Sequence, residues 1–188
     1  MSTIPDTSAG DEILATWGQA VADYINDNTS LTAATAGITN TETQVVGVTI
    51  PAGSLIVGTT YRLMVQATVT SSAANAVTHR VRIGPTTLTG NIVTSAAPTA
   101  TTTASADGYG MTALVTVRST GATGTITGNA HYVGGVTQPF ANNAGHTSTT
   151  GTVVVDTTVD NILEFTIVTA AGTTTVTGRL AIIERLTP

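Results

Sequence analysis

The hydrophobic pattern changes once along the chain, from the spacing of a helix to the spacing of strands. Near the N-terminus, large apolar residues recur at i, i+1, i+4, i+8, i+11 and i+12, which is one face of a helix. These residues are Ile13, Leu14, Trp17, Val21, Tyr24 and Ile25. We therefore expect one amphipathic helix over residues 11–27. A helix of this length is only marginally stable alone, so its apolar face has to pack on another surface.

Beyond residue 43 the apolar positions alternate with polar ones, which is the period of a β-strand. In "YRLMVQATVT", residues 61–70, the apolar face runs from Tyr61 to Val69, with Arg62 and Gln66 on the opposite face. Similar runs occupy 44–50, 76–84, 86–93, 112–118, 123–133, 151–156, 161–169 and 174–184. Turn residues separate these runs, and the pattern predicts eight or nine strands.

Many strands without helical segments between them favour a mainly β chain, folded as an antiparallel sandwich or barrel. The stretch "TSLTAATAGITNTET", residues 29–43, is small and polar and is typical of a linker. The expected organisation is therefore an N-terminal helical segment over 1–28, a linker over 29–43 and a β domain over 44–188.

Charge is scarce and unevenly placed. Charged residues make up 9% of the chain, against roughly 25% in average soluble domains. The net charge of −5 lies in the segment before residue 30, because five of the eleven acids are there while the later acids balance six Arg. No basic stripe is present, which disfavours binding to nucleic acid.

Threonine is the commonest residue, and its β-branched hydroxyl side chain suits the solvent face of a strand without adding charge. Isolated domains usually protect sheet edges and faces with Lys and Glu, and a surface without them is a liability on a monomer. We therefore expect self-association into a closed homo-oligomer, a trimer. The chain has no Cys, no apolar run long enough to span a membrane, and no secretory signal pattern in "MSTIPDTSAGDE".

The residues that carry chemistry are few and scattered. His79 falls on an apolar strand face, where a hydrogen-bonded core or interface histidine is expected, whereas His131 and His146 are expected near loops. Asp156 and Asp160 are expected to mark a turn, without the pattern of a calcium-binding loop. "GATGTITG" lacks the Lys and helix of a phosphate loop. We expect no catalytic activity, no cofactor and no metal.

The helix motif, the strands rich in Thr, Ala and Gly, and the ending "GRLAIIERLTP" together resemble small virion proteins of tailed bacteriophages, particularly those of actinobacterial hosts. In that family "D-E-[IL]-L-x-x-W-G-x-x-V-x-x-x-[IV]-N", matched by residues 11–26, precedes a jelly-roll-like β domain. The last strand often follows "L-x-[IV]-x-[ED]", matched by Leu180, Ile182 and Glu184. The resemblance implies a jelly-roll-like β-sandwich, preceded by one N-terminal amphipathic α-helix, at a virion surface.

Members of that family are variously described as capsid decoration, head fibre and minor tail proteins. Because the chain has no collagen-like Gly-x-y tract and no heptad shaft, we expect a compact capsid decoration protein. It is expected to be made in the host cytoplasm and bound to the major capsid protein or another virion protein. The alternative is a minor tail or fibre-tip protein. A carbohydrate-binding module of sandwich fold is a third hypothesis, although few aromatic residues are present to form a sugar platform. The six apolar residues of the helix are the expected partner contact. An equally open reading is that they cover the chain's own sandwich.

Overall fold

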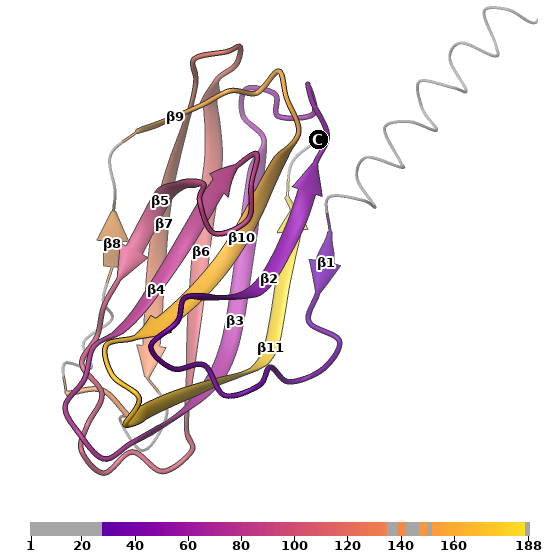
Figure 1. The fold of residues 1–188 in the computed structure, drawn as a ribbon. Coiled ribbons are helices and arrows are strands. Elements are labelled where there is room, and N and C mark those ends of the chain that lie inside the picture. The colour runs from indigo at the N-terminus through magenta and orange to yellow at the C-terminus, as the bar shows by residue number, and fades with distance from the viewer. Residues whose placement is uncertain (1–27, 135–138, 142–146, 150–151, 187–188) are drawn as a thin grey trace, which may run out of the picture.

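The computed structural model describes residues 28–134, 139–141, 147–149 and 152–186, so the helix expected over 11–27 lies outside the described residues. The described residues form eleven strands in two antiparallel sheets that face each other (Figure 1). They include no helix that is long and apolar enough to cross a membrane. The mainly β, antiparallel two-sheet architecture expected from the sequence is confirmed.

The larger sheet, sheet A, runs in the order β1, β11, β3, β6 and β7, and both β8 and β9 pair with the far side of β7. Its strands are β1 (Thr29–Ser30), β3 (Thr60–Ser71), β6 (Asp107–Ser119), β7 (Gly124–Gly134), β8 (Thr147–Thr149), β9 (Val153–Val155) and β11 (Thr174–Arg185). Sheet B runs in the order β2, β10, β4 and β5. Its strands are β2 (Thr43–Ile50), β4 (Val77–Gly84), β5 (Asn91–Ala96) and β10 (Asn161–Thr169).

The chain crosses between the sheets so that its last strands enter the middle of each. In sheet B, β10 lies between β2 and β4, and in sheet A, β11 lies between β1 and β3. The two sheets therefore depend on strands from both ends of the chain, and β7, β8 and β9 extend one edge of sheet A.

Strict alternation decides which side chains enter the core between the sheets. In β3 every inward residue from Tyr61 to Val69 is at most 2% exposed, and the residues between them face outward. The same alternation buries Val77, Val81 and Ile83 in β4. The faces predicted from the period of two are therefore confirmed in these strands.

A bulge in β11 changes which residues of that strand face the core. The pairing with β3 shifts between Gly178 and Leu180. Before the shift Val176 points inward, and after it Ala181 and Ile183 do, which leaves Leu180 on the outside. Because side chains alternate with a period of two, one extra residue moves the rest of the strand to the opposite face.

Residues 29–43, expected to be a linker, are tied to sheet A. Thr29 and Ser30 form β1 beside β11, Leu31 N–H donates to the carbonyl of Ala181, and Ile38 is 2% exposed within the core. The stretch is small and polar because it crosses the edge of a sandwich, where little apolar surface is buried. Small polar composition therefore did not distinguish a packed edge segment from a free linker.

The run over 86–93, expected to be one strand, is a turn followed by the start of β5. Strand β5 begins only at Asn91, and the residues before it form a turn in which Leu88 has a φ of 65°. The glycine at position 90 fits this turn because a Cβ there would lie 2.6 Å from the backbone of Ile83. The alternation of Thr and apolar residues at 86–90 therefore belongs to a turn.

The core contains a cluster of aromatic rings around His79. This histidine is fully buried, its Nε2 lies 2.9 Å from the hydroxyl of Tyr109, and the ring centroid of Phe165 is 6.0 Å away. Tyr132 and Phe140 complete the cluster. The expectation that His79 is a hydrogen-bonded core histidine agrees with this position. Burial lowers the pKa of His79 to about 4, although a hydrogen bond with the backbone of Ala96 acts in the opposite direction.

Acidification is predicted to destabilise the fold over the pH range in which His79 titrates. The unfolded chain takes up a proton as the pH falls below about 6.5, whereas the folded protein takes it up only near pH 4. A difference of roughly 2.5 pKa units corresponds to about 3 kcal/mol. We expect the free energy of unfolding, measured by urea denaturation, to be unaffected by this group above about pH 6.5 and to decrease steadily toward pH 4.

The variant His79→Gln is the control, because glutamine keeps a polar side chain in place without titrating. Its free energy of unfolding should be lower at neutral pH and nearly flat between about pH 6.5 and pH 5, above the range in which carboxylates titrate. If the parent and the variant lost stability in parallel on acidification, His79 would not be the group responsible.

Candidate interaction surface

The residues expected from the sequence to bind a partner, Ile13 to Ile25, all lie outside the described residues. Of the histidines, His79 is in the core, and His131 lies exposed on the outer face of sheet A, three residues before the end of β7. His146 is outside the described residues. Within the described part of the chain, no three His, Asp or Glu side chains lie close enough together to hold a metal ion.

The charged groups of sheet B are engaged with one another on its outer face. The Glu42 carboxylate accepts hydrogen bonds from Arg80 (2.5 Å), from Arg82 (2.8 and 3.1 Å) and from the hydroxyl of Thr166 (2.5 Å). Burial alone would raise the pKa of Glu42, but the hydrogen bonds and positive charges of its neighbours outweigh burial and lower it. These charges stabilise the fold locally and leave little free charge for a partner.

A second carboxylate on this sheet holds the β4–β5 turn. Glu164 is 1% exposed, and its two oxygens accept hydrogen bonds from the Gln44 side chain (2.7 Å) and the Leu88 backbone N–H (2.6 Å). Because it is buried and engaged on both oxygens, Glu164 is placed as a structural group. It does not face a site that a substrate can enter.

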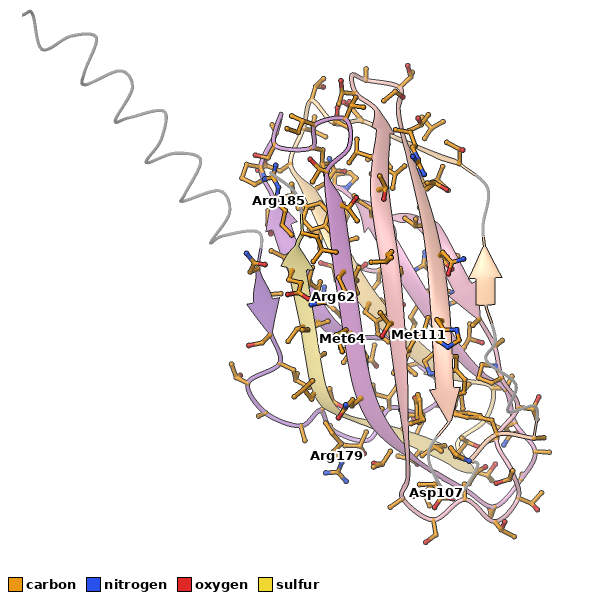
Figure 2. All side chains as sticks on the ribbon, turned by 180° about the vertical axis from the view of Figure 1, so that it is seen from behind. Arg62, Met64, Asp107, Met111, Arg179 and Arg185 are labelled. Carbon is orange, nitrogen blue, oxygen red and sulfur yellow. The ribbon has the colours of Figure 1, made fainter. Side chains whose placement is uncertain are left out.

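The outer face of sheet A has a different character and is a candidate interaction surface. We define the threonine face as the outward residues of β11, β3, β6 and β7. One row across it reads Ile182, Met64, Thr112 and His131, and the next row reads Glu184, Arg62, Leu114 and Asn129. Figure 2 looks onto this face and labels Arg62 and Met64 in its middle part.

Apolar and neutral side chains occupy the centre of the threonine face. Leu114 is 45% exposed and Leu180 is 46% exposed, which places both among the large apolar residues that the described fold leaves open to solvent. The central charges, Arg62 and Glu184, pair with each other.

Two further arginines of this face, Arg118 and Arg179, are exposed, and Arg179 donates a hydrogen bond to the hydroxyl of Thr68. Arginine is enriched in protein interfaces, so a face with apolar side chains, hydroxyls and a few arginines is compatible with contact to another protein.

The size of the threonine face suits a protein interface. Its four long strands have between 11 and 13 residues each. Strands about 4.8 Å apart with a rise of about 3.3 Å per residue give roughly 700 Å² of surface. A standard interface buries about 800 Å² per partner, so this face alone approaches the required area.

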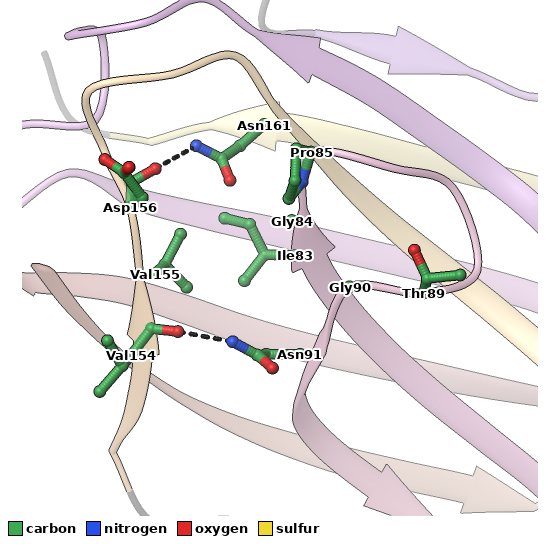
Figure 3. A pocket seen from close by; sticks show the side chains of 10 residues that line it. All are labelled: Ile83, Gly84, Pro85, Thr89, Gly90, Asn91, Val154, Val155, Asp156 and Asn161. Atoms are coloured by element: carbon green, nitrogen blue, oxygen red, sulfur yellow. Dashed lines mark hydrogen bonds between the residues drawn. The ribbon is translucent and has the colours of Figure 1, made fainter. Parts of the chain in front are cut away.

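A small cavity lies between the edges of the two sheets, where β5 and β9 approach each other (Figure 3). Its volume is about 130 Å³, and the Asn91 side chain spans the gap by donating to the carbonyl of Val154. The Asn161 amide donates to the carbonyls of Asp156 and Val159, while its oxygen is buried without a partner among the described residues. Ligand pockets usually measure about 300–1,000 Å³, so this cavity suits a few water molecules instead.

Aromatic side chains are absent from the described surface. Tyr61, Tyr109, Tyr132, Phe140 and Phe165 are the aromatic residues that the structure describes, and none is more than 5% exposed. Sugar-binding modules that stack rings on sugars need an exposed aromatic side chain. The described part of the chain supplies none, which agrees with the scarcity noted in the sequence.

Comparisons with known proteins give only remote likenesses. No family model matches the chain, and no curated protein matches it. A CBM2 module of the evolved Dit protein of Lactobacillus casei BL23 phage J-1 is 12% identical, over 76% of this chain and 69% of that chain, with a TM-score of 0.35. The infectious bursal disease virus VP2 subviral particle is 12% identical over 84% of this chain, which spans 32% of VP2, with a TM-score of 0.31.

A CBM4 structure is 13% identical, over 85% of this chain and 94% of that chain, with a TM-score of 0.29. Likenesses at this level do not bear on function. The candidate surface therefore has to be judged on its own chemistry.

Sequence reasoning inferred an uncharged face but did not locate it. Leu114 stood in the sequence as an apolar residue on the otherwise polar side of its strand, between Thr112 and Thr116, and that exception was a usable signal. Leu180 gave no comparable signal, because its outward position depends on the bulge after Gly178.

Charges placed at the centre of the threonine face are predicted to abolish self-association. In the double variant Leu114→Arg with Leu180→Arg, burying the face would leave unpaired charges, each costing about 3–5 kcal/mol when desolvated. We expect the association constant, measured by sedimentation velocity at micromolar concentration, to fall by roughly a hundredfold or more.

The matched control is Thr49→Arg with Thr86→Arg, which adds the same charge at exposed positions of sheet B and its turn. This control should keep the oligomeric state of the parent. A parent protein that is monomeric, or a face variant that associates like the parent, would contradict the assignment.

Proposed function

We propose that the protein is a bacteriophage virion structural protein, in the first instance a capsid decoration protein that binds the particle surface as a homo-oligomer. The threonine face is the observation that carries this proposal. A broad face with exposed Leu114 and Leu180 and a self-neutralised ion pair suits permanent contact with other protein. The proposed oligomer is a trimer, and the proposed partner is the major capsid protein or another virion protein.

The attachment step is proposed to use the N-terminal segment. Its six apolar residues, from Ile13 to Ile25, would pack on the particle or on a neighbouring subunit, and its acids would favour a basic partner surface. The resemblance of residues 11–26 to the phage family motif supports this role. The proposed role is structural, without a catalytic step, cofactor or metal.

A minor tail or fibre-tip protein that binds host carbohydrate is the second candidate. The proposed jelly-roll-like fold is compatible with both roles, because jelly rolls occur in viral capsid and in lectin domains. The buried state of Tyr109 and the other described aromatics favours the capsid role. Binding of the purified protein to host cell walls, together with its absence from heads in particle images, would favour the tail role instead.

Loss of the apolar side chains of the N-terminal segment is predicted to prevent attachment. In the variant Trp17→Ala with Tyr24→Ala, each truncation of a buried aromatic anchor is expected to cost about 3–5 kcal/mol of binding. The β domain has its own core and should stay folded. Particles assembled with this variant should lack the protein at the capsid surface when imaged by electron cryo-microscopy beside particles with the parent.

The control variant Gln19→Ala with Asn26→Ala changes the same segment away from its apolar face and should keep normal occupancy. Normal occupancy of the aromatic variant would show that attachment lies in the β domain. Particles imaged with the parent that carry it on the tail and not on the head would refute the capsid role.

A further inference from the structure

One end of the sandwich exposes a group of aliphatic side chains. Ile56 is 48% exposed, Val57 63%, Val159 40% and Leu186 45%. We call these four residues the apolar end. Figure 1 shows the β2–β3, β6–β7 and β9–β10 connections and the end of β11 at this end of the molecule.

Backbone hydrogen bonds hold the segments of the apolar end together. Gly53 N–H donates to the carbonyl of Thr157, and Ala52 N–H donates to the carboxylate of Asp160, which joins the β2–β3 connection to the β9–β10 connection. Leu186 N–H donates to the carbonyl of Thr60. The apolar side chains are therefore carried on segments that are fixed to one another.

A hollow opens in the same end. Its volume is about 450 Å³, Leu55 is buried at its base, and Ile56 forms part of its wall. Thr120 and Gly121 of the β6–β7 turn and Thr157 line the rest. The hollow combines apolar walls with hydroxyls and backbone groups, which suits an aromatic side chain that also carries a hydrogen-bond donor.

The chain enters the fold at this end. Asn28 accepts a hydrogen bond from the backbone N–H of Arg185, the residue before Leu186. The preceding 27 residues are therefore attached directly beside the apolar end. Their expected apolar face, from Ile13 to Ile25, needs a surface on which to pack.

We infer that in the free protein residues 11–27 of the same chain pack on the apolar end and place Trp17 over the hollow. This goes beyond the proposed function, because it concerns the protein before it meets a particle. From β1, the strands β11, β3 and β6 follow at about 4.8 Å intervals, so the end of β6 lies about 14 Å away. Eleven helical residues from Asn28 to Trp17 span about 16 Å. A helix that crosses the strand ends therefore brings Trp17 to the hollow beside Thr120.

Packing of this kind covers two apolar surfaces at once. The exposed aliphatic side chains of the apolar end and the apolar face of the segment would each promote aggregation if left open. For attachment through the same face, the segment has to leave its own sandwich and move to the particle. The free and attached states then compete for one set of side chains.

The chain contains a single tryptophan, so Trp17 reports on its own environment. In the full-length protein we expect blue-shifted emission and weak quenching by acrylamide, with no dependence on protein concentration. In Ile56→Asp with Val57→Asp, the emission should shift to the red and the quenching constant should rise toward that of a peptide of residues 1–28. Both changed side chains are exposed, so circular dichroism should show an intact fold.

The matched control is Leu114→Asp with Leu180→Asp, which makes an equal change on the threonine face and should leave Trp17 shielded. A tryptophan as exposed in the parent as in the peptide would overturn the inference. Shielding that the end variant leaves unchanged would overturn it as well. Neither result depends on particle binding, so the proposed function is tested separately.

A crosslink identifies the copy that supplies the segment. Because the chain has no Cys, a pair introduced as Trp17→Cys and Ile56→Cys gives one possible disulfide within a chain. We expect oxidation to close this disulfide within one chain, so that the free thiols disappear while the mass stays that of a monomer. In the pair Trp17→Cys with Leu114→Cys the thiols should stay free. A product of dimer mass, or no product, would overturn the inference, the first because a second copy would be the occupant.

Discussion

The pairing of the last two strands with the first ones is the constraint on which the whole sandwich depends. β10 is the only described strand that joins β2 to β4, and β11 joins β1 to β3. Neither sheet is continuous until the end of the chain has been inserted. The native pairing is therefore strongly non-local, which is typical of slowly folding β proteins. The same insertion also brings Arg185 beside Asn28, so the two ends of the described fold meet.

Most of the charged side chains that the structure describes form hydrogen bonds or ion pairs within the fold. Glu42 pairs with Arg80 and Arg82 on the outer face of sheet B. Glu164 holds the β4–β5 turn, and Arg62 pairs with Glu184. Threonine hydroxyls replace charge elsewhere on the strands, and some pair across strands, as Thr60 and Thr116 do at 3.0 Å. A surface of this kind stays polar while costing less to desolvate than a charged one. It is therefore suited to permanent contact with other protein.

Most strands could be predicted from the sequence, because apolar and polar residues alternate wherever a strand buries one of its faces. The run 161–169 coincides with β10, and the inward face of β3 was read correctly from Tyr61 to Val69. β1 was missed because two residues are too short to show a period. The turn before Asn91 alternated by chance. The bulge at Gly178 is marked in the sequence only by a glycine within a strand rich in Thr, which indicates a bulge but not which residues face outward after it.

The candidate sites were harder to predict than the strands for a related reason. The apolar face of residues 11–27 was readable because a helix repeats along the sequence, but the described residues do not include it. The apolar end could not be read at all. Ile56, Val159 and Leu186 come from three distant connections, and only the folded topology brings them together. Leu114 alone left a local sign, since it interrupts a polar row.

The directions of the two surfaces limit which assemblies are possible. The threonine face runs along the strands, whereas the apolar end and Asn28 lie where the strands stop. An isologous dimer with its axis perpendicular to the strands would place Asn28 of its two copies at opposite ends of the dimer, so only one copy would present this end to a particle. A cyclic oligomer with its axis along the strands points every segment the same way. Attachment of all copies to one surface therefore requires a cyclic arrangement of this second kind. In a trimer of that kind, the threonine face of each copy must meet a different surface of the next.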